Sequence, residues 1–205
     1  IVLGTRPEII KLASLINEFK KNNTDFTLVH SNQHYSKNMD SLFFEELNLP
    51  LPDHNLGVGS ASHAEQTSKI LSSLDDLFSK NKPSLIIVHG DTNTTLGGAL
   101  YASKVGVPIA HVEAGLRSYD RGMPEEINRV ITDHVSKLLF APTQETSLNL
   151  LKEGVNKSKI HVVGNTIADA IRVNSKKVRH SKNKSEYVLV TVHRPANVDV
   201  KENIF

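Results

Sequence analysis

The sequence has no cysteine among its 205 residues, which excludes a disulfide-bonded scaffold and fits a reducing cytosol. Its net charge at pH 7 is only +2, so the overall charge does not indicate nucleic acid or an anionic membrane as a partner. The start has no long apolar run, because Arg6, Glu8 and Lys11 soon follow the apolar residues 1–3. This excludes a signal peptide or a membrane span there. We expect a cytoplasmic protein that binds neither nucleic acid nor membrane.

The common cofactor motifs are missing as well. The sequence contains neither Gly-x-Gly-x-x-Gly, the dinucleotide fingerprint, nor Gly-x-x-x-x-Gly-Lys-[Ser/Thr], the P-loop. Its ten histidines are scattered, no predicted helix carries a His-x-x-x-His pair, and cysteine is absent. We therefore expect no cofactor and no dedicated metal site.

The sequence does contain a regular alternation of β-branched runs and amphipathic stretches. The runs predict strands at 1–3, 26–30, 85–89, 108–112, 138–141, 160–163 and 187–192. Several runs are apolar throughout, as expected for strands that are covered on both faces. The stretches between them predict helices at 7–22, 63–80, 93–105, 125–135, 144–153 and 166–178. Repeated strand–helix units predict an α/β fold, with a doubly wound parallel sheet.

A hydrophilic stretch divides the predicted fold. Residues 174–186 include five Lys or Arg residues, and we interpret them as a solvated basic linker rather than an anion-binding segment. This gives an N-terminal domain at 1–173, the linker at 174–186, and the beginning of a truncated second domain at 187–205. The chain starts inside a predicted strand and ends without a stop signal. We therefore expect it to be a fragment.

Acidic residues follow the ends of consecutive predicted strands. Asp91 comes after the strand at 85–89 and Glu113 after the strand at 108–112, and Glu125 follows soon after. The carboxyl ends of parallel strands form the edge where open α/β proteins bind ligands. The alternative is structural: Asp91 would cap a helix, and Glu113 would pair with Arg117. Together the acidic residues favour a site that moves protons on a polar substrate.

Histidines and cations also lie near this edge. His89 and His111 end the same two strands, and we interpret both as core residues with satisfied ring nitrogens. Arg6 and Lys11 lie at the start of a predicted helix, where a phosphate would be favoured. The alternative is a surface pair between Arg6 and Glu8, with Lys11 exposed.

Seven motifs in register resemble one enzyme family. They are Gly-Thr-Arg-Pro-Glu-Ile-Ile-Lys (4–11), Asn-Gln-His-Tyr (32–35), His-Gly-Asp-Thr-Asn-Thr (89–94), His-Val-Glu-Ala-Gly-Leu-Arg-Ser (111–118), Met-Pro-Glu-Glu-Ile-Asn-Arg (123–129), Gly-Asn-Thr (164–166) and Thr-Val-His-Arg (191–194). The chain resembles the N-terminal part of the non-hydrolysing UDP-N-acetylglucosamine 2-epimerases, in particular archaeal members. The resemblance implies a Rossmann-like first domain of a GT-B-like two-domain fold, with a UDP-sugar bound between the domains.

The resemblance also implies a reaction and roles for residues. The family eliminates UDP across C1–C2 of the sugar and adds it back to a 2-acetamidoglucal with inversion at C2. By match to the motifs, Asp91, Glu113, Glu125 and His193 are catalytic. Arg6, Lys11 and His193, with Asp91 and Glu113, bind the substrate. The family further implies a homodimer, and the fragment alone is expected to have little activity.

Several alternatives stay open at this point. The run His-Arg-Pro-Ala-Asn-Val-Asp (193–199) also resembles relatives that act on UDP-2,3-diacetamido sugars, so the substituent at C3 is undetermined. A hydrolysing relative would release UDP and free N-acetylmannosamine, but such enzymes differ around the segments at 111–118 and 123–129. A GT-B-like glycosyltransferase or a non-catalytic nucleotide-sugar binder is the alternative from another class.

Overall fold

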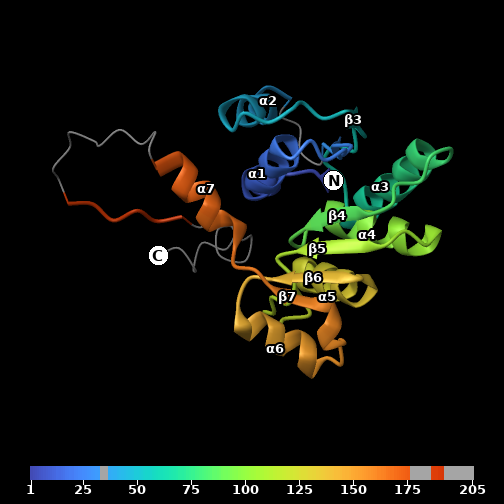
Figure 1. Ribbon diagram of the computed structural model, residues 1–205, viewed down its shortest axis with the longest axis vertical. Helices are drawn as coiled ribbons and strands as arrows, with labels where there is room; N and C mark the ends of the chain where they lie inside the picture. Colours follow the sequence, from blue (N-terminus) through green and yellow to red (C-terminus); the bar gives the residue numbers. More distant parts are fainter. Residues whose placement is uncertain (33–36, 176–185, 192–205) are drawn as a thin grey trace. The chain divides into compact units, whose positions relative to one another are not determined.

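The computed structural model describes residues 1–32, 37–175 and 186–191. The chain divides into two compact units, Ile1–Asn174 and Ser175–Phe205. Within the described ranges, the strands and helices lie in the first unit, apart from the last residue of helix α7 (Figure 1). Most of the predicted linker and of the predicted second domain lies outside the described residues, so these two assignments stay predictions.

The strands of the first unit are all parallel. They are β1 (Val2–Leu3), β2 (Val29–His30), β3 (His54–Asn55), β4 (Ile86–His89), β5 (Ile109–Val112), β6 (Leu138–Ala141) and β7 (Ile160–Val162). Hydrogen bonds join them in the orders β1-β2-β3 and β4-β5-β6-β7, and β1 packs beside β4. The order across the layer is therefore β3-β2-β1-β4-β5-β6-β7, which confirms the predicted parallel sheet.

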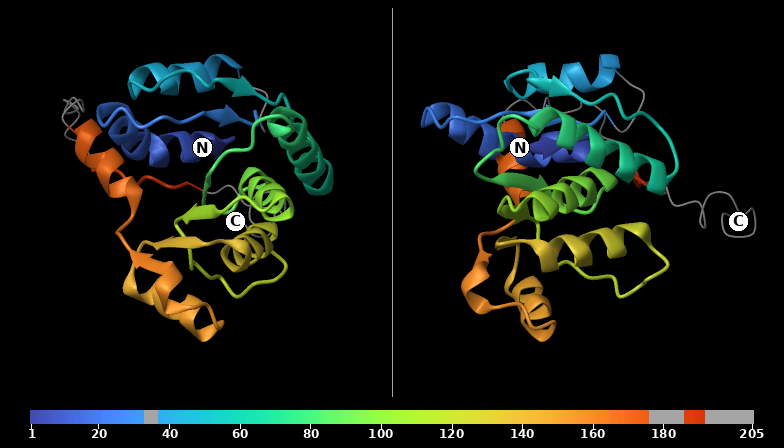
Figure 2. Two further views of the ribbon diagram at one scale, coloured as in Figure 1. Left: turned by 45° about the vertical axis from the view of Figure 1, so that its right-hand side comes forward. Right: turned by 90° about the vertical axis from the view of Figure 1, so that its right-hand side faces the viewer.

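Helices cover both faces of this layer. They are α1 (Arg6–Lys21), α2 (Lys37–Glu46), α3 (His63–Phe78), α4 (Asn93–Val105), α5 (Pro124–Val135), α6 (Gln144–Lys152) and α7 (Thr166–Ser175), with a 3₁₀ turn, η1, at Lys157–Lys159. The left view of Figure 2 shows α1, in dark blue, on one side of the strands and α3, α4 and α5 on the other. The sheet is doubly wound, as predicted.

Alternation along the strands explains why the sequence has continuous apolar runs. Val2, Ile86 and Val88 pack on the face covered by α3 and α4, whereas Leu3 and Ile87 pack on the face covered by α1. Successive side chains of a strand point to opposite faces, so a strand between two helical layers needs apolar residues at every position. Each fully buried aliphatic side chain stabilises the fold by about 1.5–3 kcal/mol.

Side-chain capping differs between the helices. The hydroxyl of Thr92 accepts a hydrogen bond from the Thr95 backbone N–H and caps α4. Thr5 occupies the cap position of α1, but its side chain makes no capping hydrogen bond. Helix α4 ends at Gly106, whose left-handed φ of 75° suits glycine.

Three elements differ from the sequence prediction. Helix α2 and strand β3 were not predicted, because β3 is only two exposed residues long and α2 follows a polar loop. The predicted strand at 187–192 is wrong for residues 187–191, which have no regular structure and expose Tyr187 and Leu189 by more than 80%. A strand needs a pairing partner as well as β propensity.

Among the described helices, none combines the length and apolar character needed to cross a bilayer.

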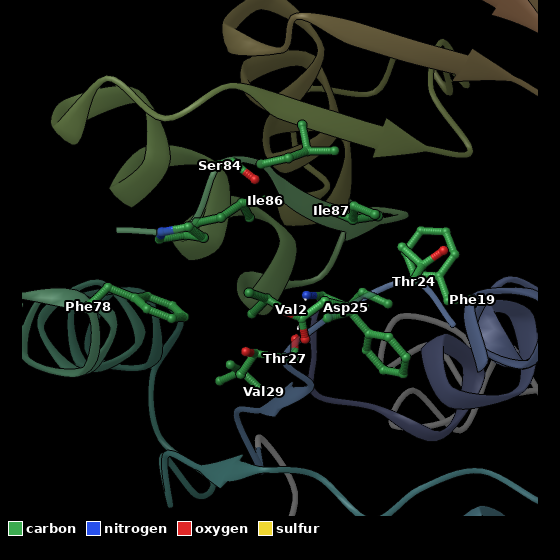
Figure 3. A pocket seen from close by; sticks show the side chains of 14 residues that line it. Val2, Phe19, Thr24, Asp25, Thr27, Val29, Phe78, Ser84, Ile86 and Ile87 are labelled. Carbon is green, nitrogen blue, oxygen red and sulfur yellow. Dashed lines mark hydrogen bonds between the residues drawn. The ribbon is translucent and has the colours of Figure 1, made fainter. Parts of the chain in front are cut away.

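A cavity of about 410 Å³ lies at the amino-terminal edge of the strands (Figure 3). Its lining includes Val2 at the start of β1, Val29 in β2 and Ile86 at the start of β4. Asp25 is the one charged side chain among the described residues that line it. The cavity therefore lacks a group of acid–base side chains, and it lies away from the strand-to-helix loops at the opposite edge.

Candidate active site

The candidate site lies at the carboxyl edge, where the strand order changes direction. Strand β1 has β2 on one side and β4 on the other, and ligands of open α/β sheets bind at such a switch point. The loop after β1 begins at Gly4, where a Cβ atom would collide with the hydroxyl oxygens of Ser31 and Thr94. Glycine therefore allows the starts of α1 and α4 to approach closely.

Glu113 follows β5 in a left-handed backbone conformation, with φ of 71°. Such a conformation is uncommon outside glycine and asparagine, and it occurs often at functional sites. Lys11 Nζ donates to both carboxylate oxygens at 2.8 and 2.7 Å, and His89 Nε2 lies 3.5 Å from Oε2. Burial alone would raise the pKa of Glu113, but His89 and Lys11 outweigh it and lower the pKa to about 2. The alternative pairing with Arg117 is wrong.

Asp91 follows β4 and has the opposite electrostatic environment. Its carboxylate pairs with Arg129 of α5 at 2.5 Å, and Thr92 caps the next helix instead of Asp91. Burial raises the pKa of Asp91, and Glu125 and Glu113 raise it further, whereas Arg129 lowers it without compensating fully. The two carboxyl groups at this edge thus differ in their tendency to hold a proton.

The remaining predicted site residues are more open. Arg6 is exposed at the first position of α1, and Glu125 is exposed in the first turn of α5. Within the described ranges, neither makes a hydrogen bond or an ion pair, although Glu125 is close enough to Asp91 to raise its pKa. His193 lies outside the described residues. The structure therefore brings Asp91, Glu113 and Lys11 to one edge, with Glu125 near Asp91.

Glu8 is a site residue that the sequence reasoning placed wrongly. It is 2% exposed and accepts hydrogen bonds from the hydroxyls of Thr5 (2.8 Å), Thr92 (3.0 Å) and Thr95 (3.3 Å). The predicted alternative, a surface pair with Arg6, is therefore wrong. Burial raises the pKa of Glu8 despite these bonds. The signal was the Thr-x-x-Glu spacing at 5–8, which is typical of a capping box.

His111 and His89 are both buried core residues, as interpreted, but only His111 has satisfied ring nitrogens. His111 Nε2 lies 2.7 Å from the carbonyl oxygen of Gly90, and Nδ1 lies 2.7 Å from Asp133 Oδ1. In contrast, neither ring nitrogen of His89 has a hydrogen-bond partner among the described residues. Arg117 joins Asp133 to Glu153 through contacts of 2.7 and 2.6 Å. These ion pairs fix the loop after Glu113.

The donor set at this edge does not resemble a metal centre. Within the described ranges, no three His, Asp or Glu side chains are grouped so that they could hold an ion. Instead, the carboxylates are paired with Lys11 and Arg129. The fold and the site define an α/β domain whose carboxyl edge brings carboxylates and cations together, an arrangement suited to proton transfer on an anionic ligand.

Comparison with known proteins identifies the family. Residues 17–205 match the family model described as UDP-N-acetylglucosamine 2-epimerase. A protein of that name from Methanocaldococcus jannaschii is 54% identical, with 100% of this chain and 58% of that protein covered. One from Methanococcus maripaludis is 52% identical over 97% of this chain and 57% of its own length. The chain belongs to the UDP-N-acetylglucosamine 2-epimerase family.

A solved structure agrees with the fold. The crystal structure of the M. jannaschii UDP-GlcNAc 2-epimerase in complex with UDP-GlcNAc and UDP has a TM-score of 0.91 and 55% identity, with 98% of this chain and 57% of that chain covered. This confirms the Rossmann-like first domain of a GT-B-like fold that the sequence predicted. The chain spans less than three fifths of the length of these relatives.

Proposed function

We propose that this chain carries the acid–base groups of an isomerase that interconverts UDP-N-acetylglucosamine and UDP-N-acetylmannosamine. Family membership supports the reaction, and the solved relative bound to UDP-GlcNAc and UDP supports the substrate. The structural observation that carries the proposal is the pair of carboxyl groups at the switch point, Asp91 and Glu113. Their pKa values are shifted in opposite directions.

The chemistry requires such a pair. Removal of the weakly acidic C2 proton needs a positioned base, and departure of UDP needs stabilisation of negative charge. Re-addition with inversion requires that a proton be delivered to the other face of the ring. Asp91, with a raised pKa, and Glu113, held ionised, can therefore divide the donor and acceptor roles, with exposed Glu125 as a third group. The sequence-based prediction that His193 contributes as well stays a prediction.

Lys11 connects substrate binding to this proton transfer. Together with Arg6 and the N-terminus of α1, it would hold the diphosphate. Lys11 pairs with Glu113, so a diphosphate that draws Lys11 away would make the Glu113 carboxylate a stronger base. Glu113 would thus become a ready proton acceptor only when the UDP leaving group is bound.

Deuterium incorporation at C2 tests the proposal. The full-length protein is incubated with UDP-GlcNAc in D₂O and followed by NMR, and we expect deuterium at C2 of a UDP-linked product. Asp91→Asn and Glu113→Gln should each lower kcat by at least about 100-fold. Glu65→Gln, at an exposed carboxylate on α3, is the matched control and should leave kcat unchanged. Free sugar as the product would instead indicate hydrolysis, and no exchange at all would contradict the proposal.

A second substrate has one supporting observation. A UDP-2,3-diacetamido-2,3-dideoxy-D-glucuronate 2-epimerase from Pseudomonas aeruginosa is 40% identical over 97% of this chain and 58% of that protein. The same deuterium assay with that sugar nucleotide decides between the substrates, and we expect the higher kcat/KM for UDP-GlcNAc.

We further propose that the full-length protein is a cytoplasmic homodimer. We also propose that the isolated 205-residue chain has little activity.

A further inference from the structure

The side chain of His111 connects the two loops that carry the candidate carboxylates. It is fully buried on β5, two residues before Glu113. Nε2 lies 2.7 Å from the carbonyl oxygen of Gly90, the residue before Asp91, and Nδ1 lies 2.7 Å from Asp133 Oδ1. One ring therefore contacts the loop after β4 and, through Asp133, the loop after β5.

Both partners of the ring are hydrogen-bond acceptors. A backbone carbonyl oxygen can only accept. The Asp133 carboxylate can also only accept, because it stays ionised: burial alone would raise its pKa, but His111 and Arg117 lower it below its ordinary value. The ring is therefore held between two oxygen atoms, each 2.7 Å from one of its nitrogens.

The charges around the ring are balanced in this arrangement. Asp133 of α5 is the anion that contacts it, and Arg117 from the loop pairs with the other oxygen of Asp133 at 2.7 Å. Glu153 then pairs with Arg117 at 2.6 Å. Beside His111, the paired residues on β4 and β6 are Val88 and Leu139, which are uncharged. Asp133 is therefore held in place from two sides, by the His111 ring and by Arg117.

The loop after β5 needs such a connection because the backbone of Glu113 is strained. Its φ is 71°, which a residue with a side chain rarely adopts, whereas Gly115 and Gly90 reach 82° and 71° without that penalty. Asp133 Oδ2 also accepts a hydrogen bond from the Gly115 backbone N–H at 3.1 Å. A residue held in an unfavourable conformation keeps it only where its surroundings enforce it. His111 and Asp133 supply those contacts from the core.

We propose that His111 is a positioning residue that fixes the Asp91 and Glu113 loops relative to each other. Its ring does not contact the sugar, because it is fully buried and both nitrogens are occupied. The proposal deepens the proposed function and rests on it for the kinetic consequence, but the placement of the two loops is measured independently of that function.

The positioning role is tested with His111→Gln in the full-length enzyme. His161→Gln, at an exposed histidine of β7, is the matched control. We expect kcat to fall about 100-fold, the cost of a misplacement of about 1 Å, with KM changed less than threefold. The backbone amide signals of Asp91 and Glu113 should shift in His111→Gln and not in the control. Unchanged kcat and unchanged amide signals would refute a positioning role. A wild-type enzyme without epimerase activity would contradict the proposed function alone, because the amide signals are read independently.

Discussion

Removal of the Lys11 ammonium should change the acidity of Glu113 and the stability of the fold together. The pair is largely shielded from water, with Lys11 and Glu113 side chains 24% and 10% exposed. Lowering the pKa of Glu113 from 4.5 to about 2 corresponds to roughly 3 kcal/mol in favour of the ionised folded state. Screening by solvent reduces this value, so Lys11→Met should cost about 2 kcal/mol at pH 7.

The sign of the pH dependence follows from the lowered pKa. The folded state holds Glu113 ionised more readily than the unfolded chain, so this stabilisation is present in full above about pH 4.5. It is lost as the pH falls toward 2, where Glu113 becomes protonated in the folded state as well. The stability difference between wild type and Lys11→Met should therefore shrink across that window.

Two measurements on the chain itself check this reasoning. Carboxyl-carbon NMR follows the titration of Glu113, and urea unfolding at several pH values gives the stability. Lys69→Met is the matched control, because Lys69 and Glu65 also lie 2.7 Å apart but are about half exposed. It should change stability by less than about 0.5 kcal/mol. If Glu113 titrates with the same pKa in wild type and Lys11→Met, Lys11 does not hold the carboxylate ionised.

Three further predictions concern the framework of the site. Gly115→Ala should destabilise the fold by at least about 2 kcal/mol in urea unfolding, because φ is 82° and the new Cβ would collide with the Thr146 carbonyl oxygen; wild-type stability would contradict the geometry. Arg117→Met should lower the free energy of unfolding by about 3–5 kcal/mol, since it leaves the buried charge of Asp133 with one partner fewer. A loss of stability below about 1 kcal/mol would argue against the ion pair. Thr92→Ala should cost about 1 kcal/mol through the lost cap, and Thr92→Ser should recover most of it.

Local pattern predicted the fold well and the side-chain pairings poorly. The apolar runs and helical stripes identified the parallel sheet, and the positions of Asp91 and Glu113 at strand ends indicated the edge of the candidate site. The partner of Glu113 was not predictable in this way, because Lys11 lies 102 residues earlier. A spacing rule reports neighbours on one helix or strand, whereas this pair depends on how β1 and β5 are placed across the sheet.

The histidines show the same limit. Both His89 and His111 lie near the ends of apolar strands, which predicted their burial. Sequence alone did not show that His111 would face two acceptors while His89 would lack a hydrogen-bond partner among the described residues. Those environments are set by loops and helices that come later in the chain, so they appear only once the tertiary structure is known.

The central position of β1 has a consequence for folding. This strand is the first part of the chain, yet it lies beside β4, more than 80 residues later. Contacts of such sequence separation slow folding, because the intervening chain must be ordered before they form. The candidate site at the carboxyl edge of β1 and β4 therefore forms only after that step. A ligand that binds there would stabilise only molecules that have completed folding. Ligand binding would therefore measure the fraction of native molecules more directly than helix content does.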